Sequence, residues 1–254
     1  YTDAKIIGRF SKVERQIDLL IDAEIADFKF RVVIDAKYRN KKIDVNDVES
    51  FIGFIRDVEA DRGVMISTEG YSTAAINRGY YEDSGIELDI LNFKELEIYH
   101  AFGALPYAGE FGVTLPAPLG WIIDGTQREE MVATLYQRGL TWKSAVDRSE
   151  WMYVNFWKKD ETANDIDSLC KFQETYMEGY KIEYQGGPIR KDATTKIRLV
   201  KRPNHPVPEY TGYVEFEKFI LFCVLFTPKE LEAKNLRKLR YILRCVVPFN
   251  VLHK

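Results

Sequence analysis

The stretch Arg31-Val-Val-Ile-Asp-Ala-Lys-Tyr38 decides how the first part of the chain is interpreted. Its Val and Ile residues predict a β-strand. Alternate side chains of a strand point to opposite faces, so Asp35 and Lys37 share one face. An ionised group at the end of an apolar strand is costly unless its pKa shifts or an opposite charge, such as a metal ion, compensates it. The stretch therefore indicates a functional site.

A second acid stands in the preceding stretch, Arg15-Gln-Ile-Asp-Leu-Leu-Ile-Asp22, where Asp18 lies among apolar residues. Antiparallel pairing could bring Asp18 opposite Asp35, because cross-strand Cβ atoms are only ~5 Å apart. Mg²⁺ favours one or two carboxylates together with carbonyl oxygens and water. We therefore predict a metal site of Asp18 and Asp35, with the carbonyl of Ala36 as a third ligand.

The segments around these two stretches predict a β-β-β-α-β-α-β order. The first three strands are expected at Ala4–Phe10, Gln16–Ile25 and Phe28–Tyr38. Asp44 can cap a helix whose apolar positions recur at helical spacing from Val45 to Val58. Gly63–Thr68 predicts a strand, Ser72 caps a second helix that runs through Gly79, and Ile86–Leu91 predicts the last strand.

This combination resembles the PD-(D/E)xK nuclease superfamily, in particular Mrr-like restriction endonuclease domains. The matching residues are Arg15-Gln-Ile-Asp18, Ile34-Asp-Ala-Lys37, and Gly63-Val-Met-Ile-Ser-Thr-Glu-Gly70 followed by Tyr71-Ser-Thr-Ala74. The resemblance covers about residues 4 to 91 and implies an α/β fold, a restriction-endonuclease-like mixed sheet flanked by helices.

The resemblance also implies an activity, the metal-dependent hydrolysis of DNA phosphodiester bonds in restriction or defence against foreign DNA. Asp18 and Asp35 would hold Mg²⁺ or Mn²⁺, and Lys37 would position or help deprotonate the attacking water. The implied partner is DNA. A homodimer or other subunits of a defence system are further expected partners, because cutting both strands suggests a dimer.

Chain-breaking residues set the expected domain boundary. Pro106, Gly109, Gly112, Pro116 and Pro118 fall within a short stretch, a density that disfavours helix and strand alike. We therefore predict a nuclease domain at 1–104, a linker at 105–118, and an α+β domain at 119–254 that binds substrate, a partner or a signal. Its expected strands are 121–123, 151–157, 181–185, 195–202 and 212–227, and its expected helices are 127–138, 165–180 and 228–245.

Composition excludes several classes of protein. The longest apolar run, Phe219 to Phe226, is too short to span a bilayer. Three cysteines and three histidines are scattered without a paired spacing, which argues against disulfides, thiolate zinc sites and histidine-centred nucleases. A reducing cytoplasm fits best, and any metal should be a hard ion bound by oxygen.

The charge is distributed unevenly along the chain. Residues 1–100 carry 14 Lys and Arg against 20 Asp and Glu, whereas residues 101–254 carry 22 against 19, so the two halves should have different roles. In the last helix a basic face could contact a phosphate backbone, although such faces are more often plain solvated surface. Its residues are Lys234, Arg237, Lys238 and Arg244.

Other interpretations remain open at this stage. Asp35 and Lys37 could form a surface ion pair on an edge strand, and Asp18 could be a surface acid like Asp22. Glu14 is more typical of a surface charge than of a further catalytic acid. The leading alternative function is a catalytically inactive binding or regulatory protein with a nuclease fold, whose C-terminal domain carries the function. A third is a ligand-sensing second domain that licenses cutting.

Overall fold

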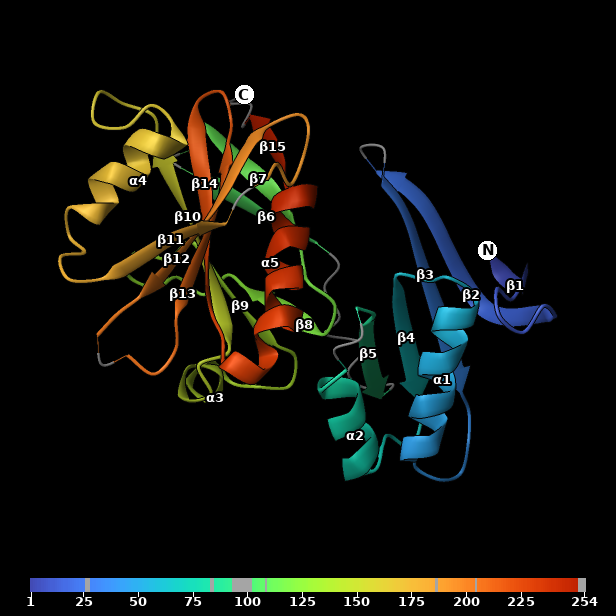
Figure 1. Ribbon diagram of the computed structural model, residues 1–254. Helices are drawn as coiled ribbons and strands as arrows, with labels where there is room; N and C mark the ends of the chain where they lie inside the picture. Colours follow the sequence, from blue (N-terminus) through green and yellow to red (C-terminus); the bar gives the residue numbers. More distant parts are fainter. Residues whose placement is uncertain are drawn as a thin grey trace. The chain divides into compact units, whose positions relative to one another are not determined.

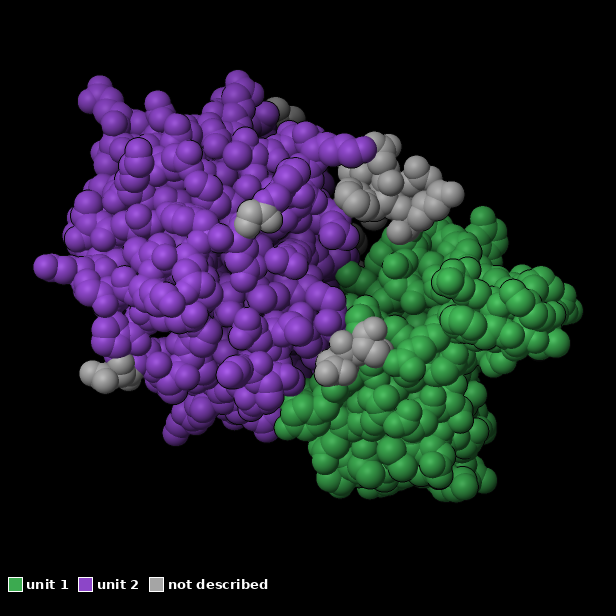
Figure 2. All heavy atoms as spheres, in the orientation of Figure 1, with its two compact units in different colours: residues 1–99 green, residues 100–254 purple. Residues whose placement is uncertain are grey.

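The computed structural model describes residues 1–25, 28–82, 85–92, 102–107, 109–185, 187–203 and 205–250. The chain divides into two compact units, unit 1 at residues 1–99 and unit 2 at residues 100–254 (Figures 1 and 2). Within the described residues, none of the helices combines the length and apolar character that a bilayer crossing requires.

Unit 1 is built on a five-stranded mixed sheet with the order β1-β2-β3-β4-β5. The strands are β1 (Thr2–Ile7), β2 (Glu14–Ile25), β3 (Phe28–Lys37), β4 (Arg62–Ser67) and β5 (Glu87–Asn92). The first three strands pair antiparallel, and β3, β4 and β5 pair parallel. The strand that carries Asp35 and Lys37 is therefore the central strand of its sheet, not an edge strand.

The two helices of unit 1 are α1 (Val45–Asp57) and α2 (Thr73–Tyr80). The α1 helix begins with the expected cap at Asp44, which forms a reciprocal capping box with Asp47, and α2 begins with the expected cap at Ser72. Both helices share one hydrophobic core with the sheet, made chiefly of Ile17, Val33, Val48, Phe51, Ile52, Ile55, Met65 and Ala75. The element order matches the predicted β-β-β-α-β-α-β.

Unit 2 contains a seven-stranded antiparallel sheet in the order β11-β12-β13-β14-β10-β9-β8. These strands are β8 (Trp121–Asp124), β9 (Ala133–Gln137), β10 (Trp151–Lys158), β11 (Lys181–Gln185), β12 (Thr194–Lys201), β13 (Glu209–Glu215) and β14 (Phe219–Phe226). A second sheet orders its strands β15-β7-β6, with β6 (Phe102–Tyr107), β7 (Phe111–Pro116) and β15 (Val247–Asn250).

Helices cover both faces of the larger sheet of unit 2 (Figure 1). The α5 helix (Glu232–Cys245) packs Leu239, Ile242 and Leu243 into the main core, together with residues of β7 and the larger sheet. The α4 helix (Ile166–Glu174) packs on the opposite face, where Tyr213 and Ile220 point. The short α3 helix (Trp142–Asp147) follows β9.

The predicted linker at 105–118 is wrong, because this stretch forms most of a β-hairpin within unit 2. Strands β6 and β7 pair antiparallel, with Pro106 opposite Gly112. Proline is tolerated because β6 is an edge strand of its sheet. Gly112 is needed for close approach, since a Cβ there would lie 2.5 Å from the backbone oxygen of Leu105.

Three further predicted elements of unit 2 need correction. The helix expected at 127–138 is instead a turn followed by β9, whose Ala133 and Leu135 enter the core. The strand expected at 212–227 is a hairpin of β13 and β14, because the chain reverses between Glu215 and Phe219. The helix expected at 165–180 ends at Glu174. In the first two cases pairing within the sheet determines the structure.

Candidate active site

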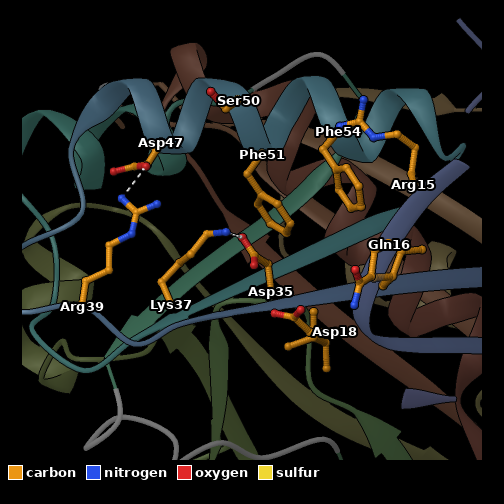
Figure 3. A pocket seen from close by; sticks show the side chains of 12 residues that line it. Arg15, Gln16, Asp18, Asp35, Lys37, Arg39, Asp47, Ser50, Phe51 and Phe54 are labelled. Carbon is orange, nitrogen blue, oxygen red and sulfur yellow. Dashed lines mark hydrogen bonds and ion pairs between the residues drawn. The ribbon is translucent and has the colours of Figure 1, made fainter. Parts of the chain in front are cut away.

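A pocket of about 600 Å³ opens between β2, β3 and α1 of unit 1 (Figure 3). Charged groups from the two strands lie at its centre, and aromatic rings from α1 form a wall. The lining residues are Arg15, Gln16, Ile17, Asp18, Ile34, Asp35, Lys37, Arg39, Asp47, Ser50, Phe51 and Phe54. The three predicted catalytic residues are therefore all in one pocket.

Asp35 and Lys37 are in direct contact, as the strand alternation predicted. Lys37 Nζ lies 2.9 Å from Asp35 Oδ2, and their side chains are 32% and 19% exposed, respectively. Burial raises the pKa of Asp35 above its usual value, and the nearby Asp18 carboxylate adds to the effect, while Lys37 opposes both. A carboxylate whose charge is disfavoured in this way is one that an added cation would stabilise.

Asp18 is brought to the same place by a hydrogen bond to the neighbouring strand. The backbone NH of Ala36, between Asp35 and Lys37, donates to Asp18 Oδ2 at 2.9 Å. The backbone ladder between β2 and β3 reaches Leu19 opposite Ile34, and the Asp18 side chain extends this pairing by one hydrogen bond. Figure 3 shows the Asp18 and Asp35 carboxylates facing each other.

The donor set fits a hard divalent cation. Two adjacent carboxylates and a nearby backbone carbonyl are ligands that Mg²⁺ accepts, with the remaining positions taken by water or phosphate oxygens. Within the described part of the chain, no group of three or more His, Cys, Asp or Glu side chains has the geometry of a metal site. A metal here would therefore depend on oxygens beyond the two acids.

Three charged residues of the pocket, Arg15, Arg39 and Asp47, were not predicted as site residues from the sequence. Arg39 follows Lys37 by two positions, and its Nη1 lies 2.8 Å from Asp47 Oδ1. Arg15 lies 5.0 Å from the centre of the Phe54 ring, and its Nη1 lies 3.2 Å from Asp57 Oδ2. The alternation that pairs Asp35 with Lys37 could have been extended to Arg39, but a side chain on α1 could be assigned only with the helix in place.

Residues 2–96 match a restriction endonuclease family, Mrr_cat. The resemblance seen in the sequence is thus confirmed for the N-terminal part of the chain, and all pocket residues fall within the matched range. No curated protein matches the chain.

Two solved structures are similar at low identity. One is the crystal structure of a protein of unknown function, AF1548, with 17% identity and a TM-score of 0.30 over 37% of this chain and 48% of that one. The chain thus spans about half the length of that protein. The other is the solution structure of cyanobacterial PsbP, CyanoP, from Synechocystis sp. PCC 6803, with 10% identity and a TM-score of 0.37 over 59% of this chain and 94% of that one.

Other polar residues of unit 1 have structural partners. Glu14 pairs with Lys5 at 2.8 Å on the surface, and Asp22 pairs with Arg31 at 2.8 Å. The hydroxyl of Ser72 accepts a hydrogen bond from the Ala75 NH as a helix cap. The Ser67 hydroxyl donates to the Gly70 carbonyl at 3.2 Å. None of these four residues lines the pocket.

The basic face predicted for the last helix needs correction. Lys234 and Lys238 are buried, at 9% and 3% exposure, and Lys238 Nζ donates to the Leu119 carbonyl at 2.9 Å. Arg237 is half-buried and Arg244 is exposed. The four residues therefore do not form one exposed surface, because the helix is covered on more than its apolar side.

Proposed function

We propose that the chain is a metal-dependent endonuclease that hydrolyses phosphodiester bonds of DNA in restriction or defence against foreign DNA. One observation carries the proposal. Asp18 and Asp35 face each other beside Lys37, at the centre of a pocket within the residues that match the restriction endonuclease family. This arrangement brings together two oxygen ligands and one cation, the groups that phosphodiester hydrolysis uses.

The carboxylates of Asp18 and Asp35, with the carbonyl of Ala36, would hold Mg²⁺ or Mn²⁺. When bound, the metal supplies positive charge that stabilises the scissile phosphate. Asp18 keeps its orientation through the hydrogen bond from the Ala36 NH. Asp35 holds the Lys37 ammonium group at 2.9 Å, which keeps Nζ in the pocket. There the ammonium donates a hydrogen bond that positions the attacking water, and its positive charge favours deprotonation of that water.

The proposal also covers the role of unit 2 and the assembly of the protein. Unit 2 recognises the substrate, a partner or an activating signal, and the protein acts in the cytoplasm. Two copies, or this chain with other subunits, place two sites on the two strands of a duplex. The support for a distinct role of unit 2 is that the pocket residues all belong to unit 1.

The test is cleavage of plasmid, linear and single-stranded DNA by the full chain with Mg²⁺, Mn²⁺ or EDTA. The wild type is compared with Asp35→Ala and Lys37→Ala, and with Asp22→Ala and Lys5→Ala as matched controls, since both control residues form surface ion pairs outside the pocket. We expect metal-dependent cutting that the two pocket variants lose and the two controls keep.

The opposite result would be an absence of cutting on every substrate, together with equal thermal stability of the wild type with and without metal. That outcome would contradict the nuclease proposal and would favour a binding or regulatory protein with the same fold. A metal-induced rise in Tm that Asp35→Ala abolishes would locate the metal independently of the choice of DNA substrate.

A further inference from the structure

Two arginines lie on opposite sides of the acid pair in the pocket, Arg39 on one side and Arg15 on the other (Figure 3). We propose that Arg15 and Arg39 bind the backbone phosphates on either side of the scissile phosphate, so that one nucleic-acid strand crosses the pocket along α1. This inference rests on the proposed function and names the residues that would position its substrate.

Arg39 is held in place by an ion pair that uses only part of its guanidinium group. Its Nη1 contacts Asp47 Oδ1 at 2.8 Å, and its side chain is 38% exposed. A guanidinium group has five N–H donors in a planar fork, which matches phosphate oxygens in pairs. The carboxylate of Asp47 belongs to the capping box of α1, so Arg39 is anchored to the first turn of that helix.

Arg15 is held from two sides near the other end of α1. Its guanidinium lies 5.0 Å from the centre of the Phe54 ring, and Nη1 lies 3.2 Å from Asp57 Oδ2. The Asp57 side chain is only 8% exposed, whereas that of Arg15 is 34% exposed. A cation that is stacked on a ring and paired with a buried acid loses little further freedom when it binds a phosphate.

The spacing of the two anchors suits a nucleic-acid backbone. Asp47 and Phe54 are seven positions apart on α1, which corresponds to roughly 10 Å along the helix axis. Phosphates of one DNA strand advance about 3.4 Å per nucleotide along the duplex axis. The two anchors are therefore far enough apart to hold different phosphates of one strand, and the acid pair lies between the two arginines (Figure 3).

The charge of the pocket supports the same assignment. Its side chains include three cations, Arg15, Lys37 and Arg39, and three carboxylates, Asp18, Asp35 and Asp47. A divalent cation bound by the acid pair would give this balanced set a net positive charge, which favours a polyanion. The two arginines extend that positive charge to both sides of the reaction centre.

The test measures binding of a labelled DNA duplex over a range of salt concentrations. The parent protein is the full chain with Asp35→Asn, so that binding is observed without cutting. We expect Arg15→Gln and Arg39→Gln each to weaken binding and to reduce the slope of log K against log salt by about one. Arg9→Gln is the matched control, because Arg9 also pairs with a carboxylate, Glu59 at 2.9 Å, but does not line the pocket.

Two further measurements separate phosphate binding from a structural role. Arg15→Lys keeps the charge, so it should restore most of the salt slope that Arg15→Gln loses. In a second measurement, a single phosphate beside the cleavage position is replaced by an uncharged methylphosphonate. This replacement should weaken DNA binding by the parent protein. It should leave binding nearly unchanged in the variant, Arg39→Gln or Arg15→Gln, whose arginine would contact that phosphate.

The outcomes distinguish the two proposals. If the parent binds DNA and the unmutated chain cuts it, but the slopes of Arg15→Gln and Arg39→Gln equal that of Arg9→Gln, the assignment of the arginines is overturned and the nuclease stands. If the parent does not bind and the unmutated chain does not cut, the proposed function fails, and this inference fails with it.

Discussion

Asp18 Oδ2 accepts a hydrogen bond from the backbone NH of Ala36 at 2.9 Å, so the acid of β2 is fixed to the peptide between Asp35 and Lys37. The side chain of Asp18 thus has two tasks, one structural and one electrostatic. The hydrogen bond closes the end of the β2–β3 pair, and the negative charge faces Asp35.

The two tasks of Asp18 can be separated by two substitutions. An asparagine retains an oxygen that can accept the Ala36 NH, whereas alanine does not. We expect both Asp18→Asn and Asp18→Ala to lose metal-dependent cutting. Only Asp18→Ala should lose the hydrogen bond to the Ala36 NH, which contributes about 1 kcal/mol of stability. Hydrogen exchange at Ala36 should therefore be several-fold faster in Asp18→Ala. Equal exchange in both variants would contradict the structural task.

Alanine substitutions at two glycines of unit 1 should have opposite effects on the stability of the protein. A Cβ at Gly63 would lie 2.1 Å from Ile55 Cδ1 and 2.9 Å from Phe51 Cε1, so Gly63→Ala should cost about 1–3 kcal/mol of stability. Gly53 lies within α1, and outside the helix's own backbone no atom lies within 4 Å of the position that a Cβ would take. Gly53→Ala should therefore stabilise by about 0.5–1 kcal/mol. Urea unfolding followed by circular dichroism checks both signs. A neutral Gly63→Ala would contradict the described packing.

Asp57 predicts a pH dependence of stability. The Ser11 hydroxyl and NH, and the Phe10 NH, donate to its carboxylate at 2.6, 3.0 and 2.8 Å, and these bonds hold the pKa of Asp57 below its usual value. A lowered folded-state pKa stabilises the protein above the unfolded-state pKa, and this contribution is lost as pH falls through the folded-state pKa. Asp57→Asn should therefore be less stable than the wild type at neutral pH.

The stability difference between the wild type and Asp57→Asn should shrink progressively as the pH is lowered below about 4. Urea unfolding at a series of pH values measures this difference directly. A gap that stays constant across the acid range would show that the charge of Asp57 is unimportant and that only its shape matters.

The Lys238→Ala substitution should lower the stability of the protein without lowering its affinity for DNA. Its buried ammonium group donates to the Leu119 carbonyl, and Lys238→Ala would leave that carbonyl without this donor, at a cost of about 1–3 kcal/mol. All four tryptophans belong to unit 2, so their fluorescence follows its unfolding. Arg240→Ala is the control, because Arg240 is exposed. Weaker DNA binding by Lys238→Ala at unchanged stability would contradict this prediction and would support DNA contact by the basic face of the last helix.

The elements of unit 1 could be predicted because local and long-range signals agree there. The α1 helix has a capping residue at Asp44 and one buried face that includes Val48, Ile52 and Ile55, and both signals are visible in the sequence. The D-x-K stretch forms a strand, and its alternation places Asp35 beside Lys37. That β3 would be the central strand depends on the sheet order, which no local pattern specifies.

Unit 2 was harder because tertiary contacts overrule local preference. Pro106 and Gly112 disfavour a strand locally, yet they pair in a hairpin whose edge position and close approach accommodate them. Lys238 was predicted on a solvated face because its partner is a backbone carbonyl at Leu119, far away in the sequence. Arg15 was missed as a pocket residue for a related reason, since its position depends on the Phe54 ring of α1.

The pocket residues all come from one uninterrupted stretch, from Arg15 to Phe54. The α1 helix, however, packs on β4 and α2, and its Ile55 and Phe51 side chains surround Gly63 of β4. A segment cut from the chain after Phe54 would carry every lining side chain but would lack the surface on which α1 packs. Transfer of this reaction centre into another scaffold should therefore require β4 and α2 as well as the β2–β3 hairpin and α1.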